Sequence, residues 1–144
     1  GHASRSWLLD NNFIPAELIE AYADAVTRRD ADDWGACWAQ DAKWEMPDYP
    51  EFPPQEGRDN IVALWKSAME QYPGIMFQAW PGAIEIDGDH AKVRSWTAEV
   101  YDQGDNTVRD RGAYDDECVK VDGRWVFSRR SFRNIHKQIQ PKGC

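Results

Sequence analysis

Histidine is scarce in this sequence, with three among 144 residues. One of them, His2, follows Gly1 and is typical of an expression-tag remnant, which leaves His90 and His136 as native histidines. His90 falls in a predicted turn and His136 at a predicted strand end, so we expect both side chains to be exposed. No HExxH motif is present, and we expect no metal site built on histidine.

Cysteine is equally rare, and its spacing predicts no cross-link. Cys37, Cys118 and Cys144 lie far apart, form no CxxC motif and are odd in number. A disulfide framework of the kind found in small secreted domains does not fit this pattern. We therefore expect reduced thiols.

Positive charge and long apolar runs are lacking as well. Lys and Arg number 17 against 25 Asp and Glu, which gives a formal net charge of -8 at pH 7. Such a surface disfavours nucleic acid and anionic membranes as partners. No apolar run approaches the roughly 20 residues that span a bilayer, and no basic-then-apolar leader opens the chain. We expect a cytoplasmic protein.

Motifs for bound nucleotides and for a nucleophilic serine are absent too. The sequence has no glycine-rich phosphate loop, dinucleotide fingerprint or GxSxG elbow, so any chemistry is expected to need no cofactor. Aromatic side chains are plentiful instead, with eight tryptophans. A chain of this length and composition fits one domain that buries a core and still encloses a cavity.

The first half of the chain predicts three helices. Apolar residues recur every four positions from Ile14 to Val26, and Pro15 lies in the first turn, as in an amphipathic helix. Asp32 or Asp33 can cap a short second helix.

A loop and the third helix follow. Segment 47–54 is rich in proline, whose rings remove backbone donors, so we expect a loop over one end of the domain that can serve as a lid. Asp59 can cap the third helix, and Pro73-Gly74 ends it.

From there the apolar pattern changes to a period of two, which is typical of strands. After a short strand at 42–46, the strand patterns cover residues 75–80, 83–86, 90–101, 107–121 and 124–135. Asp87-Gly88 and Asp122-Gly123 are predicted hairpin turns. Helices first and antiparallel strands afterwards predict the α+β class.

Alternation along the strands places two carboxylates on the inward face. Along 90–101 the largely uncharged parity holds Thr97 and Tyr101, with Glu99 as its exception. Along the next strand the inward parity holds Tyr114 and Asp116. On the last strand we place five residues inside, although a bulge could exchange them for Trp125 and Phe127: Val126, Ser128, Arg130, Phe132 and Asn134.

Glu99 is the leading candidate for a general acid or base. Apolar surroundings disfavour its charged form and raise its pKa toward neutral pH, where proton transfer is most effective. The alternative is a carboxylate that only neutralises an inward arginine such as Arg130. For Asp116, the ion pair with Arg130 is favoured over a catalytic role.

Aromatic residues supply the remaining candidates. Tyr22 and Tyr114 are the tyrosines best placed to donate hydrogen bonds to a developing oxyanion. Several tryptophans, Trp44, Trp65 and Trp80 among them, can wall a slot for a flat ring, although core packing explains most of them equally well.

Three segments together resemble the SnoaL-like families of the nuclear transport factor 2-like superfamily: DWGACWAQDAKW (33–44), GAYDD (112–116) and DGRWVFSRR (122–130). The similarity spans about residues 14 to 135. It implies a cone-shaped α+β barrel, cystatin-like, in which three N-terminal helices pack on a curved antiparallel sheet around a blind pocket. We accordingly expect a tag remnant and arm at 1–13, the domain at 14–137 and a tail at 138–144.

The resemblance also implies roles for single residues. Tyr22 matches a first-helix tyrosine of ketosteroid isomerases and bile-acid dehydratases, and Glu99 falls where the latter carry an aspartate. Arg130 matches an arginine of the hexachlorocyclohexane dehydrochlorinase pocket. The histidine-aspartate dyad of that enzyme is missing, because Thr27 replaces the aspartate and the histidine position falls near Phe77 or Gln78.

The expected site therefore combines four catalytic residues, Glu99, Tyr22, Arg130 and Tyr114, with a substrate-binding set and no metal. The substrate-binding set is Trp44, Trp65, Trp80, Thr27, Thr97, Tyr101, Asp116, Phe132 and Asn134.

The expected function is a cofactor-independent acid-base lyase, dehydrating or deformylating, that acts on a small aromatic or polycyclic molecule. Lignin-derived diarylpropanes are one candidate substrate class. An isomerase or cyclase for a steroid- or polyketide-like substrate is the nearest rival. The alternative from a different class is a non-catalytic module that binds a hydrophobic ligand. The expected partners are such a small molecule and further copies of the chain, in a homodimer or higher homo-oligomer.

Overall fold

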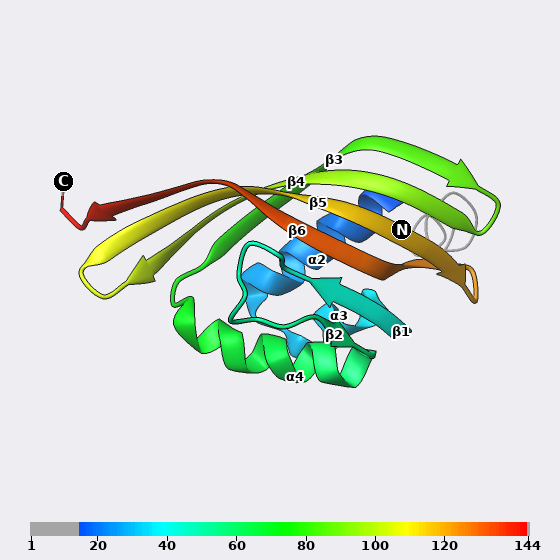
Figure 1. Cartoon of the computed structure of the whole chain (residues 1–144), viewed down its shortest axis with the longest axis horizontal. Helices are drawn as coiled ribbons and strands as arrows, with labels where there is room; N and C mark the ends of the chain where they lie inside the picture. Colours follow the sequence, from blue (N-terminus) through cyan, green and yellow to red (C-terminus); the bar gives the residue numbers. More distant parts are fainter. Residues whose placement is uncertain (1–14, 144) are drawn as a thin grey trace, which may run out of the picture.

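The computed structural model describes residues 15–143; the expected arm at 1–13, Ile14 and Cys144 lie outside the described residues. The helices are α2 (Pro15–Arg28), α3 (Ala31–Ala36) and α4 (Arg58–Ala68), and a short 3-10 helix, Met69–Gln71, extends α4. The strands are β1 (Trp38–Glu45), β2 (Gln55–Glu56), β3 (Met76–Asp87), β4 (His90–Gln103), β5 (Asn106–Val121) and β6 (Arg124–Pro141). The three helices lie on one face of the curved sheet (Figure 1).

The six strands form one open sheet in the order β2-β1-β6-β5-β4-β3. The pairing is antiparallel throughout except between β1 and β6, which run parallel. The α+β class and the arrangement of three helices on a curved sheet are confirmed. The expectation of a purely antiparallel sheet is wrong for this one pair, because the chain crosses from β1 through α4 and β3 to β5 before it returns as β6.

Helix α2 is anchored on the sheet by its apolar stripe and by one hydroxyl. Leu18, Tyr22 and Val26 are each at most 4% exposed, as their four-residue spacing predicts. The Phe77 N–H donates to Thr27 Oγ1 at 3.0 Å, and the Thr27 hydroxyl donates to the Phe77 carbonyl at 3.3 Å. Thr27 thereby joins α2 to β3, and Tyr22 is held beneath the sheet.

The expected helix caps are each wrong by two or three positions. The N-cap of α3 is Asp30, whose side chain accepts from the Asp33 N–H at 2.9 Å, while Asp32 and Asp33 lie in the first turn. The residue preceding α4 is Gly57 at φ 89°, and Asp59 lies in the first turn. Acidic residues favour both a cap and the first turn, so their presence alone does not fix where a helix begins.

Both predicted hairpin turns are present, but the first is shifted by one residue: Asp87 pairs with His90, so its loop is Gly88-Asp89. Asp122 and Gly123 have φ of 51° and 78°, as a two-residue type I′ hairpin requires, which confirms that turn. Residues 76–80 and 83–86 of the two expected strands belong to the single strand β3, whose register with β4 shifts between Pro81 and Ile84. The strand runs on past this irregularity, which is a bulge and not a turn.

A bulge in β6 decides which side chains face inward. The register with β5 shifts so that Phe127 pairs with Cys118 and Arg129 with Glu117, which leaves Ser128 unpaired. Phe127 therefore faces the helices and is 0% exposed, and so is Arg130 two residues after the bulge. The expected inward position of Ser128 is wrong. A bulge that exchanges it for Phe127, as the sequence allowed, explains the difference.

The end of β6 extends the domain beyond its expected boundary. The strand continues to Pro141, which pairs with Asn106 of β5, so most of the expected tail at 138–144 belongs to the sheet. Of the described helices, none is long and apolar enough to cross a membrane.

The expected exposure of the two native histidines is confirmed, although His90 begins β4 and His136 lies within β6. Cys37 and Cys118 are buried free thiols, whereas Cys144 is not among the described residues. His90 and His136 are both exposed. None of these four described side chains lines the cavity described next.

Candidate active site

A cavity of about 100 Å³ lies between the sheet and helices α2 and α4. Most of its lining is aromatic or aliphatic, and its acidic members are Glu99 and Asp110. The apolar and tyrosine lining consists of Tyr22, Val26, Trp44, Met46, Tyr49, Phe52, Leu64, Trp65, Ala68, Met69, Tyr72, Ile75, Phe77, Tyr114 and Phe132. Such a surface suits a small molecule with a flat apolar body and few polar groups.

Packing behind the cavity fixes its aromatic wall. Trp65 of α4 stacks on the fully buried Trp34, with ring centroids 4.6 Å apart and an interplanar angle of 11°. Trp34 also contacts Trp44 of β1, with centroids 5.5 Å apart. Because these rings are held from behind by other rings, the wall is rigid before any ligand arrives.

The proline-rich loop covers one end of the cavity. Tyr49 stacks on Phe132 with centroids 6.2 Å apart, and its hydroxyl accepts from Asn134 Nδ2 at 3.2 Å. Phe132 can lie against β5 only because Gly112 has no side chain; a Cβ there would collide with the ring. The covering position agrees with the expected loop, and its action as a lid stays a prediction.

Two tyrosines from different elements meet deep in the cavity. Tyr22 of α2 and Tyr114 of β5 have ring centroids 6.5 Å apart, and Trp44 Nε1 donates to the Tyr114 hydroxyl at 3.4 Å. Burial raises the pKa of both phenols above the usual value near 10. At neutral pH both keep their protons and can donate hydrogen bonds to a ligand oxygen.

Glu99 is the titratable group best poised for proton transfer. It points from β4 into the cavity, opposite Asp110 of β5 in the strand register. Burial first, and the adjacent Asp110 carboxyl second, raise the pKa of Glu99 to about 7. A carboxyl with that pKa can both take and return a proton at neutral pH.

Asp110 is a buried carboxylate that, within the described part of the chain, has partners at only one of its two oxygens. The residue is 5% exposed, its Oδ2 accepts from the Tyr101 hydroxyl at 3.4 Å, and Lys137 Nζ lies 3.8 Å from the same oxygen. Burial raises the pKa of Asp110, while Lys137 and Tyr101 act against that shift. Its other oxygen, Oδ1, is buried with no hydrogen-bond partner among the described residues.

Arg130 lies behind the tyrosines and not in the cavity. Its Nε donates to Asp116 Oδ1 at 2.7 Å, and both side chains are 0% exposed. Nη2 donates to Ser95 Oγ at 2.9 Å. The guanidinium carbon lies 3.6 Å from the Tyr114 ring centroid and 4.4 Å from that of Tyr22, so these rings separate it from a ligand.

The structure brings six of the expected site residues together around the cavity: Tyr22, Trp44, Trp65, Glu99, Tyr114 and Phe132. Thr27 is occupied by the Phe77 backbone, Tyr101 lies behind Asp110, and Asp116 lies behind the tyrosines with Arg130. Thr97 and Asn134 do not line the cavity either.

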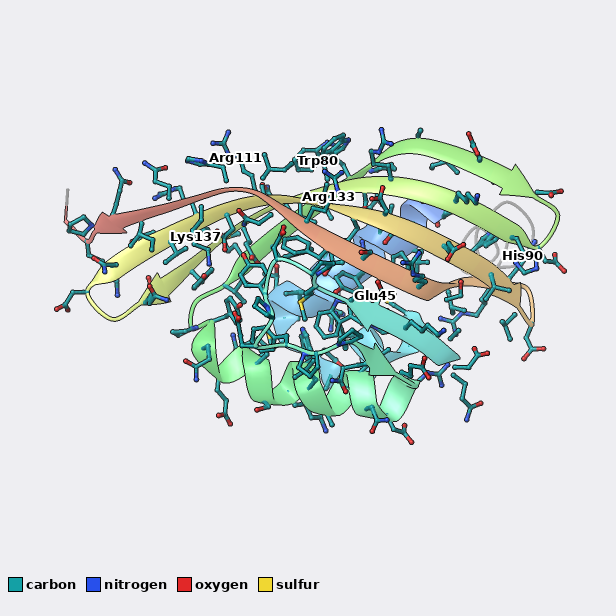
Figure 2. The ribbon with its side chains drawn as sticks, viewed as in Figure 1. Glu45, Trp80, His90, Arg111, Arg133 and Lys137 are labelled. Carbon is teal, nitrogen blue, oxygen red and sulfur yellow. The ribbon has the colours of Figure 1, made fainter. Side chains whose placement is uncertain are left out.

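The expected place of Trp80 in the cavity wall is wrong. Its side chain is 49% exposed and points away from the helices, on the outer face of β3 (Figure 2). Apolar residues occupy both faces of this strand, so its periodicity does not separate a cavity wall from an exposed patch.

The cavity lining also contains residues that were not expected in the site: Asp110, Tyr49, Phe52 and Tyr72. A signal for Asp110 was available, since it has the same parity as Gly112 and Tyr114 and should face inward with them. The loop aromatics carry no periodicity, and only the folded chain shows where they point. Among residues 15–143, no group of three or more His, Cys, Asp or Glu is placed to hold a metal ion.

The chain belongs to the SnoaL-like domain family, whose sequence profile matches residues 16–131. A search of curated protein sequences found no significant match. Among solved structures, similar folds include a scytalone dehydratase candidate from Novosphingobium aromaticivorans, with 22% identity, TM-score 0.75, and 89% of this chain and 90% of that chain covered. Another is the hexachlorocyclohexane dehydrochlorinase LinA-type3 from Novosphingobium barchaimii, with 17% identity, TM-score 0.76, and 99% and 93% covered. A cystatin-like protein from Nostoc punctiforme has 15% identity, TM-score 0.68, and 87% and 91% covered.

Proposed function

We propose that the protein is a cofactor-independent acid-base lyase for a small, uncharged aromatic molecule, with Glu99 as the group that moves the proton. The observation that carries this proposal is the Glu99 carboxyl, with a pKa of about 7, inside a cavity walled by aromatic rings. Membership of the SnoaL-like family and the dehydratase and dehydrochlorinase neighbours agree with elimination chemistry.

The proposed reaction needs one base that becomes an acid. Glu99 takes a proton from the substrate, the electrons of the broken bond form a carbon-carbon double bond, and a carbon-oxygen bond breaks. The departing oxygen then receives the proton from Glu99, so that water is released and the carboxylate is restored. Tyr22 and Tyr114 donate hydrogen bonds to the oxygen on which charge develops.

A diarylpropane diol of the lignin type suits this arrangement. If Glu99 deprotonates its hydroxymethyl group, the carbon-carbon bond breaks, formaldehyde departs and the electrons form a stilbene double bond. The benzylic hydroxyl leaves and takes the same proton, which balances the reaction as stilbene, formaldehyde and water. Two aryl rings can pack on the Trp44, Trp65 and Phe132 surfaces.

Arg130 is assigned a positioning role in this reaction. Its guanidinium lies against the rings of both Tyr22 and Tyr114 and is itself fixed by Asp116 and Ser95. The arginine therefore holds the two hydroxyls in place without touching the ligand.

The test is a panel of aromatic diols, ethers and ketones, first by thermal shift and then by product analysis with formaldehyde detection. Stabilisation followed by an alkene product supports the lyase. Binding with no product from any stabilising ligand supports a non-catalytic module instead, and rearrangement without loss of atoms supports an isomerase.

We further propose a homodimer formed through the outer face of β3 and β4. Met76 and Trp80 on this face are 59% and 49% exposed, and Trp80 pairs with Trp96 across the strands. Figure 2 shows Trp80 on the sheet face opposite the helices. An exposed apolar patch with a polar rim is typical of an association surface.

Trp80→Asp should convert that dimer to a monomer, because an isologous interface places the introduced charge twice in one contact. Light scattering after size exclusion measures the mass. Val121→Asp, at a residue 47% exposed beside the β5–β6 turn, is the matched control and should stay dimeric. A wild-type monomer, or a Trp80→Asp dimer, contradicts the assignment.

A further inference from the structure

Glu99 and Asp110 form a pair that the acid-base role of Glu99 alone does not use. They are direct partners in the antiparallel register of β4 and β5, and both reach the cavity. Directly opposed side chains on antiparallel strands have Cβ atoms roughly 5 Å apart. Two carboxyl groups that close, away from water, do not both ionise readily, so one proton is retained between them.

The surrounding groups favour the negative charge on Asp110. Lys137 of β6 forms an ion pair with Asp110 Oδ2, and the Tyr101 hydroxyl donates a hydrogen bond to the same oxygen. Two further titratable groups face the pair, Tyr49 of the loop and Tyr72 after α4. Burial raises the pKa of Tyr49 to about 12 and raises that of Tyr72 as well, so both phenols are neutral. Asp110 Oδ1 is buried with no hydrogen-bond partner among the described residues, so it can accept a hydrogen bond from protonated Glu99.

We propose that Asp110 is a second working carboxyl of the site, and that Glu99 and Asp110 share one proton and together bind an uncharged hydroxyl group of the ligand while excluding anionic ligands. A hydroxyl both donates and accepts a hydrogen bond, and the singly protonated pair offers one donor and free acceptor positions to match it. This inference rests on the proposed function only in that the cavity binds an aromatic ligand.

Exclusion of anions follows from the lining. No Lys, Arg or His is among the described residues that line the cavity. Arg130 is screened by the rings of Tyr22 and Tyr114, and Lys137 is engaged by Asp110. A carboxylate on the ligand would therefore lie beside the pair with no cation left for its own charge, because Lys137 already compensates Asp110. Such an uncompensated charge is unfavourable in an apolar cavity.

The experiment compares 2-naphthol with 2-naphthoate, which share the naphthalene ring and differ in charge, by titration calorimetry at pH 6. Wild type should bind 2-naphthol at least about ten-fold more tightly. In Glu99→Gln/Asp110→Asn, which keeps the shape of both side chains, the ratio should fall to within about three-fold. Asp115→Asn, an exposed carboxylate on the outer face of β5, should keep the wild-type ratio.

Equal or tighter binding of 2-naphthoate by wild type overturns the proposal, and so does a ratio that survives in the double variant or the absence of binding by both probes. The single variant Asp110→Asn separates the two acids: its ratio should lie between those of wild type and the double variant, and an unchanged ratio removes Asp110 from the site. These readouts need no turnover, so a failed lyase assay and a failed charge selection remain distinguishable.

Discussion

Glu99→Gln should reduce turnover of an identified substrate by about 10²–10⁴-fold while leaving the fold and ligand affinity nearly unchanged. Gln keeps the shape of the side chain and can still hydrogen-bond, but it cannot take a proton. In wild type the active form of the base is the carboxylate, so kcat/KM should rise with pH through about 7, the pKa of Glu99, and level off above it.

The matched control for this variant is Glu85→Gln, an exposed carboxylate on β3 outside the cavity, which should keep full activity. A Glu99→Gln enzyme that turns over at the wild-type rate would show that the carboxyl is a structural group and that another residue moves the proton. A loss confined to KM would instead assign Glu99 to binding.

Asp116→Ala should destabilise the fold by about 3–5 kcal/mol, the largest stability effect that we expect from a single polar residue here. Arg130 is 0% exposed and donates its shortest hydrogen bond to Asp116, so truncating the acid leaves a guanidinium buried without its counter-charge. Urea unfolding followed by tryptophan fluorescence measures the change.

Glu117→Ala is the control on the same strand, because Glu117 pairs with Arg129 at 3.7 Å on the exposed face and its loss should cost only about 0–1 kcal/mol. The double variant Asp116→Ala/Arg130→Met should be more stable than Asp116→Ala, since it removes the orphaned charge as well. If Asp116→Ala costs no more than Glu117→Ala, the pair does not stabilise the core as described.

Periodicity predicted the parts of this molecule in which one face is apolar and the other charged. The apolar stripe of α2 predicted that Tyr22 faces the sheet. The alternation along β4 predicted that Glu99 faces inward, because a shift of one residue would expose the whole inward set of that strand. The ion pair of Asp116 with Arg130 followed from the same parity on neighbouring strands, and the register confirms it.

The sequence could not place features that depend on local irregularity or on three-dimensional distance. The bulge at Ser128 exchanges the faces of β6, and apolar residues on both sides of β3 left Trp80 ambiguous. The sequence predicted that Arg130 lies near the site, but the position of Tyr22 and Tyr114 between it and the ligand space depends on how α2 packs on β5.

The cavity is proposed to hold Glu99 at a pKa suited to proton transfer. A pH titration of the Glu99 side-chain carboxyl by carbon-13 NMR measures that pKa directly. The signal is assigned by its loss in Glu99→Gln. The structure predicts a midpoint near 7. A midpoint near the ordinary value of about 4.3 for glutamate would contradict it, because the carboxyl would then be a solvated anion with no proton to return at neutral pH.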